Sequence, residues 1–413
     1  MATTLAPLRH RDFRRLWTGT FLATAGQWIQ QATLGWVVYE VTKSPAVLGA
    51  VLGVRAVPML LLAPISGYVA DRFDRRFALA ASQLLMVVIS LALSALLAFE
   101  VIEVWHLFAF SVLSGVGAVF DRTMRNTLVF SSVPRTEAAN AVALNSIAFS
   151  VTRAVGPGIA GFLIAGVGAA WNFSIQGLLY FGVCLVALSV SAPPPAVERK
   201  GRASPWHDMK EGLHFATTDP VARVTFILGL VPPLFLIPCF SALVPIFAAD
   251  VHNAGPEGLG LMLSAVGVGG IVGGIAAAWA TRYDRTGLVQ TVALAAFGAT
   301  LFCFAIAPGI ELAVLWLALA GIAEMVHFTL HVTTLQMCAP ERLRGRMASL
   351  LPMFPAFISI GSLLAGLLAS IFSPQTVVTL LVTVAMGVVA LAWLRTPALR
   401  AVTLSALIGG EKK

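Results

Sequence analysis

The stretch GYVADRFDRR, residues Gly67–Arg76, is the most informative part of this sequence. One apolar run ends in it and another follows, and two aspartates and three arginines lie between them. A shorter charged turn, TRYDR at residues 281–285, separates two further apolar runs about half a chain length later. A charged turn that joins two apolar helices once in each half predicts a chain built from two related halves.

The composition indicates that lipid, rather than water, surrounds most of the folded chain. The 413 residues are 58% hydrophobic and only 11% charged, with a mean hydropathy of +0.88. Soluble proteins carry roughly 25% charged residues. The formal net charge is +8. In a membrane protein such an excess usually reflects arginines in cytoplasmic loops, so we expect no nucleic-acid partner.

Apolar runs long enough to span a bilayer, which takes about 20 residues, occur throughout the chain. They predict an all-α membrane protein with twelve transmembrane helices in two six-helix bundles, residues 1–192 and 221–413. Residues 193–220 form a proline-containing linker, in which residues 206–215 could make a short amphipathic helix. The predicted spans are residues 14–40, 46–70, 77–99, 104–128, 139–166, 172–192, 221–248, 258–280, 287–308, 311–336, 347–372 and 374–395.

The 27 lysines and arginines predict the orientation of these helices. Most of them fall in the two terminal segments, in the linker and in alternate loops, the pattern known as positive-inside. We therefore expect both termini and the linker to be cytoplasmic. The four cysteines are widely spaced and indicate neither a disulfide framework nor a metal site. A phosphate-binding P-loop is absent from the sequence, so we expect no ATP-driven cycle and no cofactor.

The two halves also repeat each other weakly. GPGIAG at Gly156–Gly161 resembles GSLLAG at Gly361–Gly366. Two sets of six spans in the same orientation predict bundles related by an axis along the membrane normal. The paired positions in the first and second half are Gly115 and Gly321, Thr123 and Thr329, Thr127 and Thr333, and Pro134 and Pro340.

These motifs resemble the major facilitator superfamily over nearly the whole chain. Its pattern between the second and third helices is G-x-L-A-D-R-x-G-R-K. WVVYEVTKSP at Trp36–Pro45 and ERLRGRM at Glu341–Met347 resemble the branch that contains enterobactin exporters and multidrug effluxers. Gly156, Pro157 and Gly161 resemble the Gly-Pro motif of exporters, and we expect them to pack helices closely. The residues that fit the turn pattern are Gly67, Ala70, Asp71, Arg72, Arg75 and Arg76.

The resemblance implies a gate at the charged turn. Its arginines could pair with Asp121 in the fourth span, beside Arg125, when the cytoplasmic side is closed. This latch would hold the outward-facing state, and its members would be Gly67, Asp71, Arg72, Arg75, Arg76, Asp121 and Arg125. The alternative is a solvated positive loop that only sets the topology.

A polar stripe on the first span predicts a substrate-binding surface. Thr20, Thr24, Gln27 and Gln31 follow each other at spacings of four, three and four residues, with Trp28 beside them. Amides that face lipid are costly, so the stripe should line a central cavity. Hydrogen bonding between packed helices is the alternative.

Arg153 in the fifth span could pair with Asp121 or contact a substrate anion. The predicted substrate-binding residues are Thr24, Gln27, Trp28, Gln31 and Arg153.

The tenth span carries Glu324, His327 and His331 on one face. Ionisable residues inside a membrane indicate function, and histidine titrates near physiological pH. The trio therefore predicts proton coupling. A cation-binding face for substrate and a static hydrogen-bonded patch are alternatives. The spacing also fits metal ligands, but the set is too small for us to predict a metal.

Together these features predict a secondary transporter. It would export small amphipathic molecules from a bacterial cytoplasm by proton-coupled alternating access, as a monomer in the cytoplasmic membrane. The alternatives are a lipid flippase or a solute importer on the same fold. We do not expect an enzyme, because no nucleophile and base pair is evident beyond the trio of the tenth span.

Overall fold

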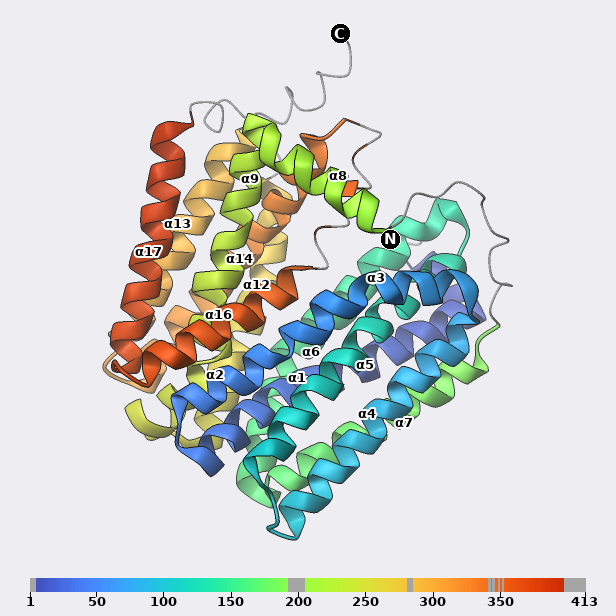
Figure 1. Ribbon diagram of the computed structural model, residues 1–413, viewed down its shortest axis with the longest axis horizontal. Coiled ribbons are helices and arrows are strands. Elements are labelled where there is room, and N and C mark those ends of the chain that lie inside the picture. The colour runs from blue at the N-terminus through green and yellow to red at the C-terminus, as the bar shows by residue number, and fades with distance from the viewer. Residues whose placement is uncertain are drawn as a thin grey trace. The chain divides into compact units, whose positions relative to one another are not determined.

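The structure is a computed structural model that describes residues 5–191, 205–280, 285–340, 343, 346–347, 350 and 353–396. Within these residues every regular element is helical (Figure 1). The α-helices are α1 (Arg11–Thr42), α2 (Pro45–Val54), α3 (Ala56–Arg72), α4 (Arg75–Ala98), α5 (Val104–Ser131), α6 (Ala138–Val167), α7 (Ala169–Ser189), α8 (Pro205–Thr218), α9 (Pro220–Val231), α10 (Ile237–Ser241), α11 (Val244–Ile246), α12 (Gly255–Ala280), α13 (Thr286–Ala305), α14 (Ile310–Met337), α16 (Phe354–Ala369) and α17 (Pro374–Arg395). Shorter segments are the 3-10 turns η1 (Ala6–Arg9) and η2 (Arg135–Glu137) and the π-helical segments η3 (Pro232–Leu236) and η4 (Phe247–Val251).

Several helix starts follow from local sequence. α9 begins at Pro220, whose missing N–H costs nothing in a first turn. The carboxylate of Asp219 before it accepts the backbone N–H groups of Val221 at 3.0 Å and Ala222 at 2.8 Å. Ser373 precedes α17 in the same way. Such capping residues replace the hydrogen bonds that a first turn lacks.

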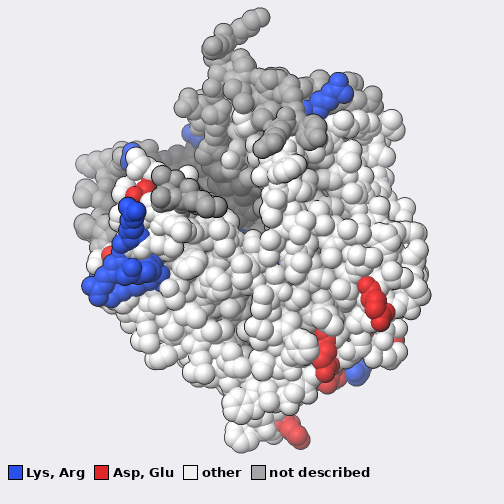
Figure 2. Space-filling model, turned by 180° about the vertical axis from the view of Figure 1, so that it is seen from behind, with Lys and Arg blue, Asp and Glu red and all other residues white. Residues whose placement is uncertain are grey.

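Ten helical segments among the described residues are long and apolar enough to cross a membrane. Two of the twelve predicted spans are not among them. One is α1, whose threonines and glutamines lower its hydropathy, and the other is α16, which is apolar but short. Figure 2 shows a face on which uncharged side chains cover most of the surface and charged ones lie near its margins.

The helices group into two compact units by their internal contacts. Unit 1 comprises Met1–Lys43, Val54–Arg202 and Gly255–Ser264, and unit 2 the remainder of the chain. Each unit thus contains most of one half of the chain and one helix end from the other half. The start of α12 belongs to unit 1, and all of α2 except its last residue belongs to unit 2. The limits of residues 1–192 and 221–413 for the two bundles stay a prediction.

Glycines let these two helix ends pack tightly within their units. In unit 1, a Cβ on Gly260 of α12 would lie 2.8 Å from the carbonyl oxygen of Pro157 and 3.1 Å from the Cα of Gly161. In unit 2, a Cβ on Gly49 of α2 would lie 2.7 Å from the Cα of Gly366 on α16. The helix backbones therefore touch at both crossings, which only residues without a side chain permit.

In unit 1, α1 packs against α5, α6 and α7, and α4 packs against α5 and α7. The apolar core at one end of these helices includes Phe13, Leu16, Met124 and Leu128, all of them almost fully buried. This core fixes α1 among its neighbours and so positions its polar residues.

In unit 2, α13 and α14 pack against each other, and both reach the helix that starts at Pro220. Four prolines interrupt this helix, at Pro232, Pro233, Pro238 and Pro245. Proline lacks an N–H and clashes with the preceding turn, and the wider turns of η3 and η4 lie beside these positions.

The predicted helix of the linker is present as α8, which packs in unit 2. Glu211 forms an ion pair with Arg346. At Gly212 an added Cβ would overlap the carbonyl oxygen of Arg346, so the two backbones are in contact. Phe215 and Ala216 join an apolar cluster with residues from the end of α14 onwards, among them Leu335.

Candidate functional site

The charged turn between α3 and α4 is held by its own residues. The carboxylate of Asp74 accepts the backbone N–H of Arg76 at 2.9 Å and its guanidinium Nη2 at 2.8 Å. The side-chain hydrogen bond from Arg76 lowers the pKa of the Asp74 carboxyl. Arg75 donates from Nε to the carbonyl oxygen of Ala70 at 2.8 Å, and Arg76 donates from Nη1 to that of Val190 at 3.1 Å. Arg75 and Arg76 thus tie the turn to the end of α3 and to the residue after α7.

The other residues of the turn have fewer described contacts. The guanidinium carbon of Arg72 lies 4.6 Å from the ring centre of Tyr68. A Cβ on Gly67 would meet nothing within 4 Å, so this glycine is not required by local packing. Asp71 lies in α3, but its side chain is outside the described part of the structure. The latch role of these residues stays a prediction.

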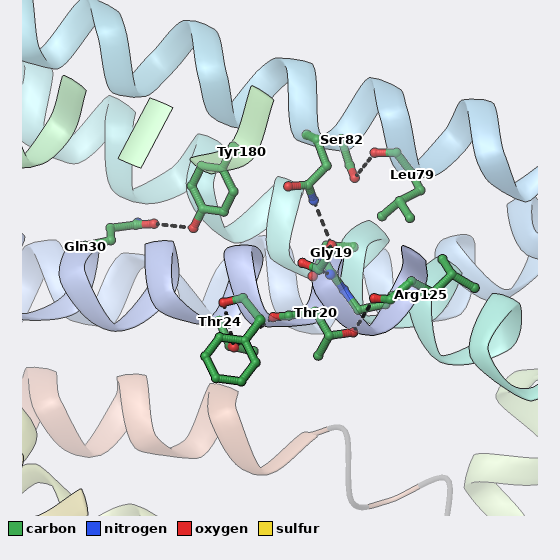
Figure 3. Close-up of polar contacts among 12 residues, drawn as sticks. Gly19, Thr20, Thr24, Gln30, Leu79, Ser82, Arg125 and Tyr180 are labelled. Carbon is green, nitrogen blue, oxygen red and sulfur yellow. Dashed lines mark hydrogen bonds and ion pairs between the residues drawn. The ribbon is translucent and has the colours of Figure 1, made fainter. Parts of the chain in front are cut away.

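A buried ion pair on α5 is the centre of the polar contacts in unit 1 (Figure 3). Arg125 binds Asp121, which lies one turn earlier, and also donates to the carbonyl oxygen of Gly19 on α1 at 2.8 Å. Gln83 of α4 donates to the same carboxylate oxygen of Asp121 at 2.7 Å. The side chains of Arg125 and Gln83 are buried. One ion pair therefore joins three helices.

The polar stripe of α1 includes a contact between helices. The hydroxyl of Thr24 donates to the carbonyl oxygen of Thr20 at 2.8 Å. Thr152 of α6 in turn donates to the Thr24 hydroxyl at 2.9 Å. Gln27 and Gln31 are half-buried. Thr24 thus joins α1 to α6, whereas the two glutamines keep part of their surface accessible.

Gln30, which lies beside the predicted stripe, is the buried amide of α1. Its Oε1 accepts from Nε2 of Gln176 on α7 at 2.7 Å. It also accepts from the hydroxyl of Tyr180 on the same helix at 3.3 Å (Figure 3). Asn172 of α7 also donates to Thr33 of α1, at 2.9 Å. Reasoning from α1 alone missed these partners. The signal was present in the apolar run of α7, which carries an asparagine and a glutamine four residues apart.

Aromatic rings and a guanidinium group gather where α1 meets α6. The rings of Trp28 and Phe149 pack edge to face, with centroids 5.5 Å apart. The guanidinium carbon of Arg153 lies 5.6 Å from the ring centre of Trp28. A Cβ on Gly156 would lie 2.8 Å from the Cβ of Trp28, so this glycine sets the approach of the two helices. The indole N–H of Trp28 is buried without a hydrogen-bond partner among the described residues.

The three predicted residues of α14 differ in how deeply their side chains are buried. Glu324 is half-buried, whereas His327 and His331 are only 3% and 2% exposed. The two imidazole rings are stacked, with centroids 5.6 Å apart and planes inclined by 15°. Nδ1 of His327 lies 3.0 Å from the backbone carbonyl oxygen of Gln290 on α13. The structure thus brings the two histidines together beside α13.

His327 and His331 of α14 align with Asp121 and Arg125 of α5 at the offset of 206 residues that relates the two halves. Each pair also meets a glutamine and a glycine on neighbouring helices. Asp121 and Arg125 bind Gln83 of α4 and the carbonyl oxygen of Gly19 on α1. His327 contacts the carbonyl oxygen of Gln290 on α13, and His331 faces Gly229 of α9. Sequence analysis did not single out the two glutamines, because an isolated glutamine in an apolar helix has no distinctive spacing.

An all-helical membrane protein of this kind has many solved counterparts. The chain matches a mutant of the nucleoside transporter NupG with a TM-score of 0.79 at 15% identity, over 93% of this chain and 99% of that one. It matches a bacterial homologue of the human lysosomal transporter Spinster with a TM-score of 0.71 at 15% identity, over 95% and 96% of the two chains. The chain therefore shares the fold of these solved transporters.

The family follows from the sequence as a whole. Residues 2–408 match the family model described as transmembrane secretion effector, and the chain belongs to this family. It is 24% identical to the staphyloferrin A transporter of Staphylococcus aureus, over 86% of this chain and 89% of that protein. It is 27% identical to the multidrug efflux pump Tap of Mycolicibacterium fortuitum, over 84% and 86%. It is 25% identical to the enterobactin exporter EntS of Citrobacter koseri, over 83% and 81%.

Proposed function

We propose that this protein exports small amphipathic molecules across the cytoplasmic membrane of a bacterium by proton-coupled alternating access. The observation that carries the proposal is a pair of polar clusters at matching positions of the two units, within a family of transporters. The relatives named staphyloferrin A transporter, enterobactin exporter and multidrug efflux pump support export of this class of molecule.

The substrate site that we propose lies on α1 and α6 of unit 1, at Thr24, Gln27, Trp28, Gln31 and Arg153. The Trp28 and Phe149 rings offer apolar area, and the guanidinium of Arg153 offers a positive charge. The unpaired indole N–H of Trp28 is a donor for an acceptor atom of the substrate. This combination suits molecules with an aromatic or apolar body and an acidic or polar group.

Proton coupling is assigned to Glu324, His327 and His331 of α14. Two neutral imidazoles in a buried site can each accept one proton, and the half-buried carboxyl beside them can exchange protons with water. The gate is assigned to the charged turn between α3 and α4 and to the ion pair of α5. Its residues are Gly67, Asp71, Arg72, Arg75, Arg76, Asp121 and Arg125. The proposal includes cytoplasmic termini and a monomer.

The test uses inside-out membrane vesicles from cells that make the protein. Their interior is acidified, and the uptake of two amphipathic dyes is followed, cationic ethidium and anionic fluorescein. We expect uptake of at least one dye that collapses with the pH gradient and falls at least fivefold in Trp28→Ala. Movement of labelled phospholipid without dye uptake would favour a flippase, and dye movement in the opposite direction would favour an importer.

A further inference from the structure

Unpaired polar atoms are concentrated in one buried cluster of unit 2. Gln290, His327 and His331 are 0%, 3% and 2% exposed. Among the described residues, five of their side-chain atoms are buried without a hydrogen-bond partner: both amide atoms of Gln290, Nε2 of His327 and both ring nitrogens of His331. Buried polar groups in proteins are nearly always paired with protein or ordered water. Such a concentration indicates a site that receives small polar species.

The hydrogen bond of His327 fixes which of its nitrogens can accept a proton. The backbone carbonyl oxygen of Gln290 can only accept, so Nδ1 of His327 carries the hydrogen in this 3.0 Å contact. In a neutral imidazole the other nitrogen then holds a lone pair. Nε2 of His327 is therefore a buried acceptor whose orientation is set by the main chain of α13.

His331 reaches the neighbouring helix α9 because position 229 is glycine. A Cβ on Gly229 would overlap the His331 ring at Cε1 and Nε2. The hydroxyl of Thr225, one turn before Gly229, is buried and has no partner in the described part of the chain. The same holds for the hydroxyl of Thr286, one turn before Gln290. The unpaired groups thus continue from the two histidines onto both adjacent helices.

The charges around the pair favour a single proton over a metal ion. The residues that the adjacent helices place around the pair carry no charge. They are Thr225 and Gly229 of α9, Thr286 and Gln290 of α13, and Phe354 of α16. The ring centroid of Phe354 lies 6.0 Å from that of His331. Glu324 lies one turn before His327 on the same helix and is half-buried. One proton adds one charge, which a single carboxylate can balance, whereas a divalent ion adds two.

We propose that Nε2 of His327 is the atom that takes up the coupling proton, and that water molecules bound by His331, Gln290, Thr225 and Thr286 deliver it. This inference rests on the proposed proton coupling. A hydronium ion gives its proton to the Nε2 lone pair and leaves as water. The imidazolium keeps its Nδ1–H bond to the Gln290 carbonyl and donates the new N–H to a bridging water. At the later stage of the transport cycle, the same nitrogen gives the proton back to water.

The first experiment determines the tautomer in the intact protein. The seven histidines are labelled with 15N, and His327 is assigned by comparing spectra of the wild type and His327→Gln in lipid. We expect the Nδ1–H form at neutral pH, and protonation of Nε2 with retention of the Nδ1–H bond on acidification. An Nε2–H tautomer at neutral pH would overturn the proposal.

The second experiment separates coupling from transport. In proteoliposomes with the dye that the wild type moves, we expect His327→Gln to lose at least tenfold of the uptake driven by a pH gradient. Exchange of dye for dye at equal pH should stay within twofold of wild type. His252→Gln, outside the spans, is the matched control and should change neither rate. Loss of both rates in His327→Gln would indicate a structural role and overturn the proposal.

The outcomes also separate this inference from the proposed function. If wild-type uptake does not depend on the pH gradient, the proton coupling itself is wrong. If it does depend on the gradient and His327→Gln depends on it equally, only the assignment to His327 is wrong.

Discussion

The two polar clusters occupy matching positions, one in unit 1 and one in unit 2, but they differ in charge and in pairing. On α5 the carboxylate of Asp121 is bonded to both Arg125 and Gln83. On α14 the corresponding histidines are uncharged in their neutral form, and five side-chain atoms of Gln290, His327 and His331 have no partner among the described residues. The same helical framework thus holds a permanent ion pair in one unit and titratable rings in the other.

This difference follows from the chemistry of the side chains. A guanidinium cannot lose its proton in a protein, so a buried arginine needs an anion beside it at all times. Imidazole can exist in either state near neutral pH, so it needs no permanent counter-ion. A permanently charged pair suits the contact proposed for the gate, whereas the histidine pair suits a group whose charge changes during a cycle. Four sets of variants test this contrast.

The largest effect is expected at the ion pair. Asp121→Ala leaves the buried charge of Arg125 without its partner, and breaking a buried pair costs about 3–5 kcal/mol. The Asp121 side chain is 24% exposed, which favours the lower end, about 3 kcal/mol. His327→Ala, the matching change in unit 2, should cost clearly less. Thermal unfolding of the purified proteins in detergent measures both, and equal losses would contradict the contrast.

A second comparison uses the glycine that faces each pair. Gly229→Ala places a methyl group against the His331 ring, and overpacking costs about 1–3 kcal/mol. At Gly19 the added carbon would lie 3.0 Å from a methyl of Val186, a side chain that can shift slightly. We expect Gly229→Ala to lower the thermal midpoint and Gly19→Ala to change it little. Gly387→Ala, where nothing lies within 4 Å, is the control and should be neutral or stabilising.

The two glutamines offer a third comparison. Gln83→Leu removes the donor to the Asp121 carboxylate, and hydrogen bonds to charged groups contribute about 1.5–3 kcal/mol. Gln290→Leu removes an amide that has no partner among the residues that the structure describes, so its cost should be smaller, under about 1 kcal/mol. Urea or thermal unfolding of the two variants gives the difference. A larger loss in Gln290→Leu would show that its partners include protein groups.

The smallest effect is expected at the charged turn. Asp74 caps α4, and the loss of such a cap costs about 1 kcal/mol. Arg76 lowers the pKa of this carboxyl, so its contribution is present above the unfolded pKa of about 3.9 and is lost as the pH falls. The difference between the thermal midpoints of wild type and Asp74→Ala should therefore narrow below about pH 4. A constant difference would mean that the charge of Asp74 does not contribute.

The helical membrane fold could be predicted because its signals are local. Apolar length predicted the spans, and the Gly67–Arg76 turn and the Gly-Pro motif indicated the superfamily. The pairing of polar residues could not be predicted, because it depends on which helix faces which. Gln27 and Gln30 look alike in the sequence, yet only Gln30 faces Gln176. In the same way, spacing alone grouped Glu324 with two histidines that are far more buried.

The proline-rich helix between Pro220 and Val251 has a mechanical consequence. A π-helical turn holds one residue more than an α-helical turn, and η3 and η4 each provide such a turn. If the surplus residue passes from one turn to another, the side chains between the two turns rotate by about 100° around the helix axis. Because proline has already removed hydrogen bonds there, few remain to be broken. This segment can therefore change the direction of its side chains around the helix axis while both helix ends stay in place.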